Sequence, residues 1–276
     1  MNDKIQPPQS GSALYKNLFE NRRRDESIKI IYDGLNAILM NVNRLISDVK
    51  ILASSNHFSS ARFLLTTARE EMAKSYIFLD MCRLNFSKYE CVLKCLCKAF
   101  YDHVFKYAYF QLNNFWPVHD MKHAKDIWEA ETTKWWPNND PTSGEPDVPH
   151  STFFDREMPL YVEYIEYDQK WSIPNDIEES VHFEKRIGAD IITKTVECFD
   201  KLQFTNSIGL FSSTCLTILN DEFQNCYISE KTEKSVIEKV NEKVALRLYK
   251  EQNIELESFF KSTFHCWPFY HFLTLK

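Results

Sequence analysis

The sequence predicts a mainly α-helical protein with an antiparallel helical bundle, a small β-hairpin insertion and a C-terminal helical region. Three observations lead to this fold class. The 276 residues include only five glycines, and long stretches lack both Gly and Pro, which is typical of long helices. Apolar residues recur at steps of three and four, as on amphipathic helices. At 44% hydrophobic, the chain can also bury a full core.

The first half of the chain predicts three consecutive long helices. The first covers about residues 27–53, and its apolar positions are Ile28, Ile31, Leu35, Ile38, Val42, Leu45 and Val49. The second covers about 58–83 and the third about 88–114. Short joints between long helices favour antiparallel packing as a bundle. A shorter helix is expected at about 119–136.

A run rich in Pro, Asn, Asp and Gly at 137–146 cannot hold regular structure and divides the sequence. Beyond it, β-branched and aromatic residues at 160–167 predict one small hairpin. Three more helices are expected near 176–201, 206–224 and 229–260. The predicted parts are a polar N-terminal arm (1–24), a helical bundle (25–136), a loop with the hairpin (137–175) and a C-terminal helical region (176–276).

Composition narrows the functional class. A net charge of -6 argues against a general nucleic-acid coat protein but leaves room for a local basic patch. No segment has the apolar run of a signal peptide or of a transmembrane helix, so no membrane partner is expected. The eight cysteines lack paired C-x-x-C spacing and predict free thiols in a reducing compartment, the cytoplasm.

Neither a metal nor a cofactor is expected. Cys91, Cys95 and Cys97 lie close together in the sequence, but structural zinc needs a second pair of ligands, and none follows. A ferritin-like di-iron bundle would need paired Glu-x-x-His segments, which the sequence lacks. A Gly-rich phosphate loop and the common hydrolase and kinase motifs are also missing.

Two charged residues interrupt an apolar stripe on the second predicted helix. The stripe reads Leu64, Thr67, Glu71, Lys74, Phe78 and Met81. Glu71 and Lys74 should therefore be partly buried. Glu70 lies four residues before Lys74 and Glu71 three before it, so either carboxylate can pair with the single ammonium. The other carboxylate needs a partner elsewhere in the fold.

His103 on the third predicted helix is the expected partner. Its core row reads Leu93, Leu96, Phe100, His103, Tyr107 and Phe110, with Lys106 on an adjacent face. A carboxylate would hold the imidazole in one tautomer, as a general base or acid near neutral pH requires. The alternative interpretation is purely structural. In that case Glu70 and Lys74 form an ordinary helix salt bridge, and His103 is a core histidine whose hydrogen bonds are satisfied.

Two motifs occur in order, A-x-E-E-x-x-K and then H-x-x-K. The first is carried by Ala68, Glu70, Glu71 and Lys74, and the second by His103 and Lys106. Over about residues 27–115, and more loosely to 175, the sequence resembles the AbiV family of abortive-infection proteins. That family belongs to the HEPN superfamily of small helical bundles. The resemblance implies a HEPN-like bundle and a role in phage defence.

The same resemblance implies an activity. HEPN ribonucleases usually act as dimers with an arginine a few residues before the histidine. The resemblance therefore implies a homodimer, RNA as a partner and metal-independent RNA cleavage. His103 would be the acid/base, Lys98 or Lys106 the phosphate holder, and Glu70 or Glu71 the group orienting His103. This chain has Lys98 five residues before His103, and lysine lacks the bidentate fork of arginine.

The alternative function is a non-catalytic effector that binds a phage or host protein and blocks translation or another essential step. In that case the charged residues form a structural network that locks the bundle. Recognition would fall to an aromatic surface, since tryptophan is enriched at interface hot spots. The candidate residues are Trp116, Trp128, Trp135 and Trp136.

Overall fold

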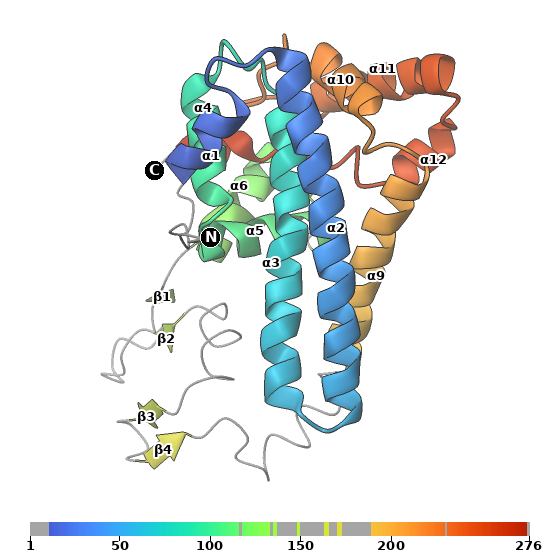
Figure 1. The fold of residues 1–276 in the computed structure, drawn as a ribbon. Coiled ribbons are helices and arrows are strands. Elements are labelled where there is room, and N and C mark those ends of the chain that lie inside the picture. Colours follow the sequence, from blue (N-terminus) through green and yellow to red (C-terminus); the bar gives the residue numbers. More distant parts are fainter. Residues whose placement is uncertain are drawn as a thin grey trace, which may run out of the picture.

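The computed structural model describes residues 11–115, 118–132, 135–136, 148–149, 163–165, 170–172, 189–229 and 231–274. Two long antiparallel helices, α2 (Arg24–Ser54) and α3 (Phe58–Cys82), run side by side through the molecule (Figure 1). Both confirm the helices predicted at 27–53 and 58–83. The turn between them contains Asn56 in the left-handed region, with φ of 62°. Asparagine tolerates this conformation better than most residues.

Helices α2 and α3 pack closely along a shared apolar seam. A Cβ added at Gly34 of α2 would lie 2.7 Å from Cε2 of Phe78 on α3. Only glycine therefore lets the Phe78 ring lie against the backbone of α2. The second half of α3 is enclosed by the rest of the chain, because every residue from 75 to 84 is buried. α3 is thus the central helix of the fold.

The prediction of one continuous third helix at 88–114 is wrong. The chain forms α4 (Glu90–Ala99) and α5 (His103–Asn114), with a turn between them. The Asp102 carboxylate caps α5 by accepting hydrogen bonds from the backbone N–H groups of Val104 (2.9 Å) and Phe105 (3.2 Å). Aspartate is a preferred N-cap because it satisfies donors that the helix leaves unpaired. His103 therefore begins α5 instead of lying inside a longer helix.

The predicted polar arm at 1–24 contains a helix, α1 (Gly11–Leu18), which packs against α4. Leu18 and Phe19 are buried, and Leu14 and Tyr15 pack against the core. These four apolar residues lie on one helical face, a pattern that the polar composition of the segment obscured. Residues 1–10 of the arm fall outside the described residues.

Helix α6 (Met121–Thr132) ends earlier than the helix predicted at 119–136. Two pairs of short antiparallel strands follow in the sequence. β1 (Trp135–Trp136) pairs with β2 (Val148–Pro149), a pairing that the sequence did not predict. β3 (Glu163–Ile165) pairs with β4 (Lys170–Ser172), in the segment where the sequence predicts a hairpin.

The C-terminal region is helical and joins the same core as the bundle. It contains α9 (Ala189–Ser207), α10 (Ser213–Phe223), α11 (Lys234–Gln252), α12 (Leu256–Lys261) and the 3-10 helix η2 (Tyr270–Thr274). α9 and α10 pack against α2 and α3 (Figure 1), and η2 packs against α3 and α4. The helix expected at 229–260 is interrupted at Asn253, which caps α11 with φ of 56°.

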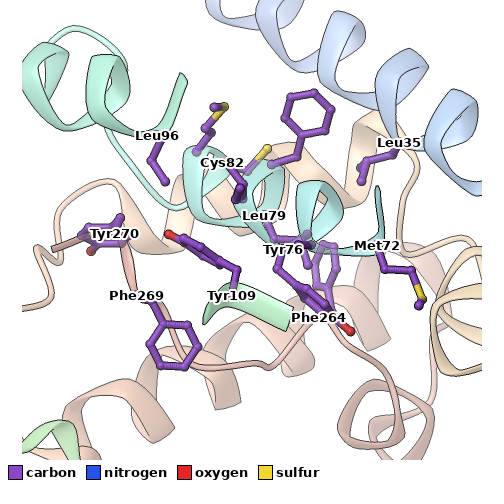
Figure 2. Close-up of a cluster of buried hydrophobic side chains, with 14 of the residues drawn as sticks. Leu35, Met72, Tyr76, Leu79, Cys82, Leu96, Tyr109, Phe264, Phe269 and Tyr270 are labelled. Atoms are coloured by element: carbon purple, nitrogen blue, oxygen red, sulfur yellow. The ribbon is translucent and has the colours of Figure 1, made fainter. Parts of the chain in front are cut away.

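Side chains from helices α2 to α5 and from the C-terminal segment meet in one hydrophobic cluster. Figure 2 shows this cluster, with Leu35, Met72, Tyr76, Leu79, Cys82, Leu96, Tyr109, Phe264, Phe269 and Tyr270 labelled. The first seven belong to α2, α3, α4 and α5, and the last three to the C-terminal segment. Residues 263–274 are therefore part of the bundle core.

A buried ionic network holds this C-terminal segment in place. Asp80 accepts hydrogen bonds from Arg83 Nη1 (2.7 Å), the Tyr109 hydroxyl (3.0 Å) and the backbone N–H of Phe269 (2.8 Å). Arg83 Nη2 also donates to the carbonyl of Phe264 at 3.0 Å. The Asp80 and Arg83 side chains are each 1% exposed. Removing either one would leave a buried charge uncompensated.

Among the described residues, no helix combines the length and the apolar character needed to cross a membrane. All eight cysteines are free thiols.

Candidate functional site

Glu70 on α3 joins the two sequence motifs. Its Oε2 atom lies 2.7 Å from His103 Nδ1 and accepts a hydrogen bond from Lys106 Nζ at 2.8 Å. His103 and Lys106 are three residues apart in the first turn of α5, so both side chains reach the same oxygen of α3. The prediction that a spare carboxylate meets His103 is confirmed, and that carboxylate is Glu70.

Lys74 pairs with the other carboxylate, Glu71. Both side chains are 18% exposed, which confirms that these charges are partly buried. Glu71 also accepts a hydrogen bond from Asn41 Nδ2 at 3.3 Å, and Lys74 Nζ lies 5.0 Å from the centre of the Phe100 ring. This second charged group therefore connects α3 to α2 and to the turn that precedes α5.

The three partners around Glu70 differ in exposure. The side chains of Glu70 and Lys106 are 7% and 5% exposed, whereas that of His103 is 42% exposed. Burial raises the pKa of the Glu70 carboxyl, but the hydrogen bond from His103 and the charge and hydrogen bond of Lys106 outweigh it. The pKa of Glu70 consequently lies below its usual value, and the group is a carboxylate at neutral pH.

This arrangement fixes the role of each ring nitrogen of His103. A carboxylate can only accept hydrogen bonds, so His103 Nδ1 carries the proton that points at Glu70. In the neutral imidazole the lone pair then lies on Nε2. A buried carboxylate thus orients a partly exposed histidine, the arrangement that suits a general base.

Lys98 does not take part in these contacts. It lies on α4 and lines a cavity next to α1, together with Lys16, Lys94 and other residues. Of the six residues predicted to form the site, the structure therefore joins Glu70, His103 and Lys106 in one group and Glu71 and Lys74 in a second. The placement of Lys98 argues against the role of phosphate holder beside His103.

The predicted aromatic surface is wrong at Trp128. This side chain is 2% exposed and packs between Phe105 and Phe272, at centroid distances of 5.7 and 5.8 Å. It is a core residue because the C-terminal segment covers it. Trp116 lies outside the described residues, and only the backbone of Trp135 and Trp136 is described.

Sequence reasoning missed Arg69, the residue before Glu70. Its buried guanidinium donates from Nε to Thr195 Oγ1 at 2.9 Å and lies 5.6 Å from the centre of the Phe110 ring. Arg69 thus anchors α3 to α9 directly beside the Glu70 group. The run Ala-Arg-Glu-Glu was visible in the sequence, but its partner lies 126 residues away and leaves no local signal.

Within the described part of the chain, no cluster of three or more His, Cys, Asp and Glu side chains could hold a metal ion. The two charged groups together contain two carboxylates, one imidazole and two ammonium groups.

Comparison with known families gives one relationship. Residues 30–191 match the family model HEPN_AbiV, described as AbiV, and this match covers more than half of the chain. The matched segment contains most of α2 and all of α3 to α6, and therefore every residue of the two charged groups. No curated protein and no solved structure matched the chain.

Proposed function

The chain belongs to the AbiV family of the HEPN superfamily, and on that basis we propose that it is an abortive-infection protein whose working centre is the Glu70–His103 pair. One observation carries the proposal: the two motifs converge on a single carboxylate oxygen that also orients a partly exposed histidine. We expect the protein to act in the cytoplasm, in keeping with its eight free thiols.

The activity that this geometry supports best is metal-independent cleavage of RNA. His103 Nε2 would accept the proton of a ribose 2′-hydroxyl while the 2′-oxygen attacks the adjacent phosphorus. The bond from phosphorus to the 5′-oxygen of the next nucleotide would break, and that oxygen would take a proton from water. The resulting hydroxide would take up the proton held by the His103 imidazolium. The products would be a 2′,3′-cyclic phosphate and a 5′-hydroxyl end.

The residues around His103 would then act through it. The Glu70 carboxylate would stabilise the imidazolium that forms when His103 takes the proton. Lys106 is bonded to Glu70 and 5% exposed, so we assign it a positioning role instead of phosphate binding. Glu71 and Lys74 would hold α3 against α2 and the turn before α5.

A cation for the phosphate would come from a second copy of the chain, and we propose a homodimer. A two-fold contact is the commonest arrangement of soluble oligomers. Because residues 75–82 of α3 are buried within the chain, the contact would use the first half of α3 and the His103 end of α5. A monomer at micromolar concentration in light scattering would contradict this part of the proposal.

A second function, binding of a phage or host protein without catalysis, is favoured by a specific observation. Lys106 and Lys74 are engaged by Glu70 and Glu71, and Lys98 lines a different cavity. On this alternative, the charged groups lock α3 to α5 and another surface of the protein recognises the target.

The deciding experiment compares the wild type with His103→Ala in a phage-challenged host and examines total RNA. The ribonuclease function predicts new RNA fragments with 2′,3′-cyclic phosphate ends in the wild type only. His57→Ala is the matched control, because His57 is an exposed histidine outside both charged groups. Resistance without any change in RNA would favour the binding function.

A further inference from the structure

A basic cavity lies between α1, the start of α2 and α4. Its volume is about 630 Å³, and its lining includes no residue of the Glu70 or Glu71 groups. Five cationic residues line it: Lys16, Arg22, Arg24, Lys94 and Lys98. Only two acidic residues, Glu20 and Glu90, line the cavity.

Ion pairing leaves this cavity with surplus positive charge. Arg24 is paired with Asp221, and Lys94 is paired with Glu90. Among the described residues, Lys16, Arg22 and Lys98 form no ion pair. Three cations therefore face a single unpaired acid, Glu20, in a chain whose net charge is -6. Such a local excess concentrates anions.

Aromatic side chains form another part of the cavity wall. The rings of Phe19 and Phe86 lie 4.9 Å apart between centroids, and Tyr15 lies 5.8 Å from Phe19. Phe19 is buried, whereas Tyr15 and Phe86 are only partly buried. A flat heterocyclic base can stack on aromatic rings of this kind, and such stacking tolerates any base.

Tertiary contacts hold the cavity walls together. A Cβ added at Gly11 would lie 2.7 Å from the Cα of Lys98, so the start of α1 rests directly on the backbone of α4. At the other end of α1, the Ser27 hydroxyl donates a hydrogen bond to the carbonyl of Leu18 at 2.6 Å. The cations and the aromatic rings therefore occupy defined positions relative to one another.

We propose that this cavity binds a phosphorylated nucleoside, with the base against Tyr15 and Phe86 and the phosphate on Lys16, Arg22 and Lys98. Positive charge alone would suit any anion, and aromatic rings alone would suit any flat apolar molecule. Their combination in one cavity fits a ligand that carries both groups. The proposal is independent of whether the chain cleaves RNA.

The cavity also adjoins the turn that leads to His103. The carbonyl of Lys98 accepts hydrogen bonds from the backbone N–H groups of Tyr101 (3.0 Å) and Asp102 (3.2 Å). Asp102 in turn caps α5, which begins with His103. A ligand that holds Lys98 would therefore contact the end of α4 from which this turn starts.

Calorimetric titration of the full chain tests the proposal, with adenosine and guanosine monophosphates and triphosphates as probes. The matching nucleosides carry the base without a phosphate, and inorganic phosphate carries the charge without a base. We expect each of them to bind on the order of tenfold or more weakly than the nucleotides. The nucleosides lack the charge-assisted contacts of the phosphate, inorganic phosphate lacks the stacking of the base, and either loss is worth about 1.4 kcal/mol or more. Affinity should also fall as salt concentration rises.

Lys98→Ala and Arg22→Ala should each weaken nucleotide binding by about tenfold, because each removes one cation from the phosphate. Lys29→Ala is the matched control, since Lys29 is an exposed lysine of α2 that does not line the cavity. Absence of nucleotide binding at millimolar concentration, or binding unaffected by both cavity substitutions, would overturn the proposal. Binding of a short 5′-phosphorylated RNA but not of free nucleotides would also overturn it.

Discussion

Glu70 and His103 lie 33 positions apart in the sequence, yet their side chains share a 2.7 Å hydrogen bond in the folded chain. Glu70 is buried in α3, and His103 is the partly exposed first residue of α5. Lys106 bonds to the same carboxylate oxygen. Each of these three side chains therefore has a distinct and testable effect on stability or function.

Lys106→Ala should lower the free energy of unfolding by about 3 kcal/mol or more, because it leaves the Glu70 carboxylate buried with only His103 as a partner. Urea unfolding followed by circular dichroism measures this loss. Lys29→Ala provides the control, since Lys29 and Asp33 form an exposed pair worth about 0.5 kcal/mol or less. Equal losses of unfolding free energy in the two variants would show that the buried pair stabilises the fold no more than the exposed pair does.

Lys74→Ala should cost less stability than Lys106→Ala. Its partner Glu71 is 18% exposed and keeps a hydrogen bond from Asn41, so water and that amide compensate part of the lost charge. If Glu71 and Lys74 are positioning residues, phage resistance should fall in a Lys74→Ala variant that remains folded. A Lys74→Ala variant that unfolds at growth temperature would indicate a purely structural role.

The lowered pKa of Glu70 predicts how stability depends on pH. A carboxyl whose pKa is lower in the folded state stabilises the fold above its unfolded pKa, near the ordinary value of 4.5. That contribution is lost as pH falls through the folded pKa. The difference in unfolding free energy between the wild type and Glu70→Gln should therefore shrink as pH falls below about 4.5. A difference that stays the same or grows as pH falls from about 4.5 to about 3 would contradict the assignment.

Asp102→Ala should destabilise the protein by about 1 kcal/mol, because the first turn of α5 loses its cap. The loss should be accompanied by reduced phage resistance, since His103 lies in that turn. Asp102→Asn keeps a capping oxygen and should retain both stability and resistance. Loss of resistance in both variants at unchanged stability would assign Asp102 a role other than capping.

Arg83→Ala should lower the free energy of unfolding by about 3 to 5 kcal/mol, because Asp80 would remain buried without its cation. Hydrogen exchange at the amide of Phe269 should accelerate, since that amide donates to Asp80. Lys261→Ala, at an exposed ion pair with Glu257, is the control and should leave exchange unchanged. Unaltered exchange at Phe269 in Arg83→Ala would contradict the role given to the network.

Local patterns in the sequence were sufficient to predict that one of two carboxylates, Glu70 or Glu71, meets His103, but not which of the two. Helical spacing identified two carboxylates that compete for one lysine, and the apolar row on the next helix contained one histidine. The same periodicity concealed the break before α5, because the three- and four-residue spacing of the row continues from α4 to α5 past Asp102. Capping by Asp102 overrides that periodicity.

Long-range contacts were beyond the reach of sequence patterns. The bond between Asp80 and the Phe269 amide spans 189 positions, and the contact between Arg69 and Thr195 spans 126. Neither pairing leaves a local signal, so the C-terminal region was predicted as a separate part and Trp128 as a surface residue. The surface interpretation of Trp128 fails because residues 263–274 complete the core.

The most direct test of the account is phage resistance in cells that express His103→Gln, with His57→Gln as the control. Glutamine is similar to histidine in volume and can still donate a hydrogen bond to Glu70, but it cannot exchange a proton near neutral pH. If His103 is the general acid/base, the variant should fold, as circular dichroism would show, and the cells should lose resistance completely. Full resistance in the folded variant would contradict the catalytic role and leave protein binding as the function.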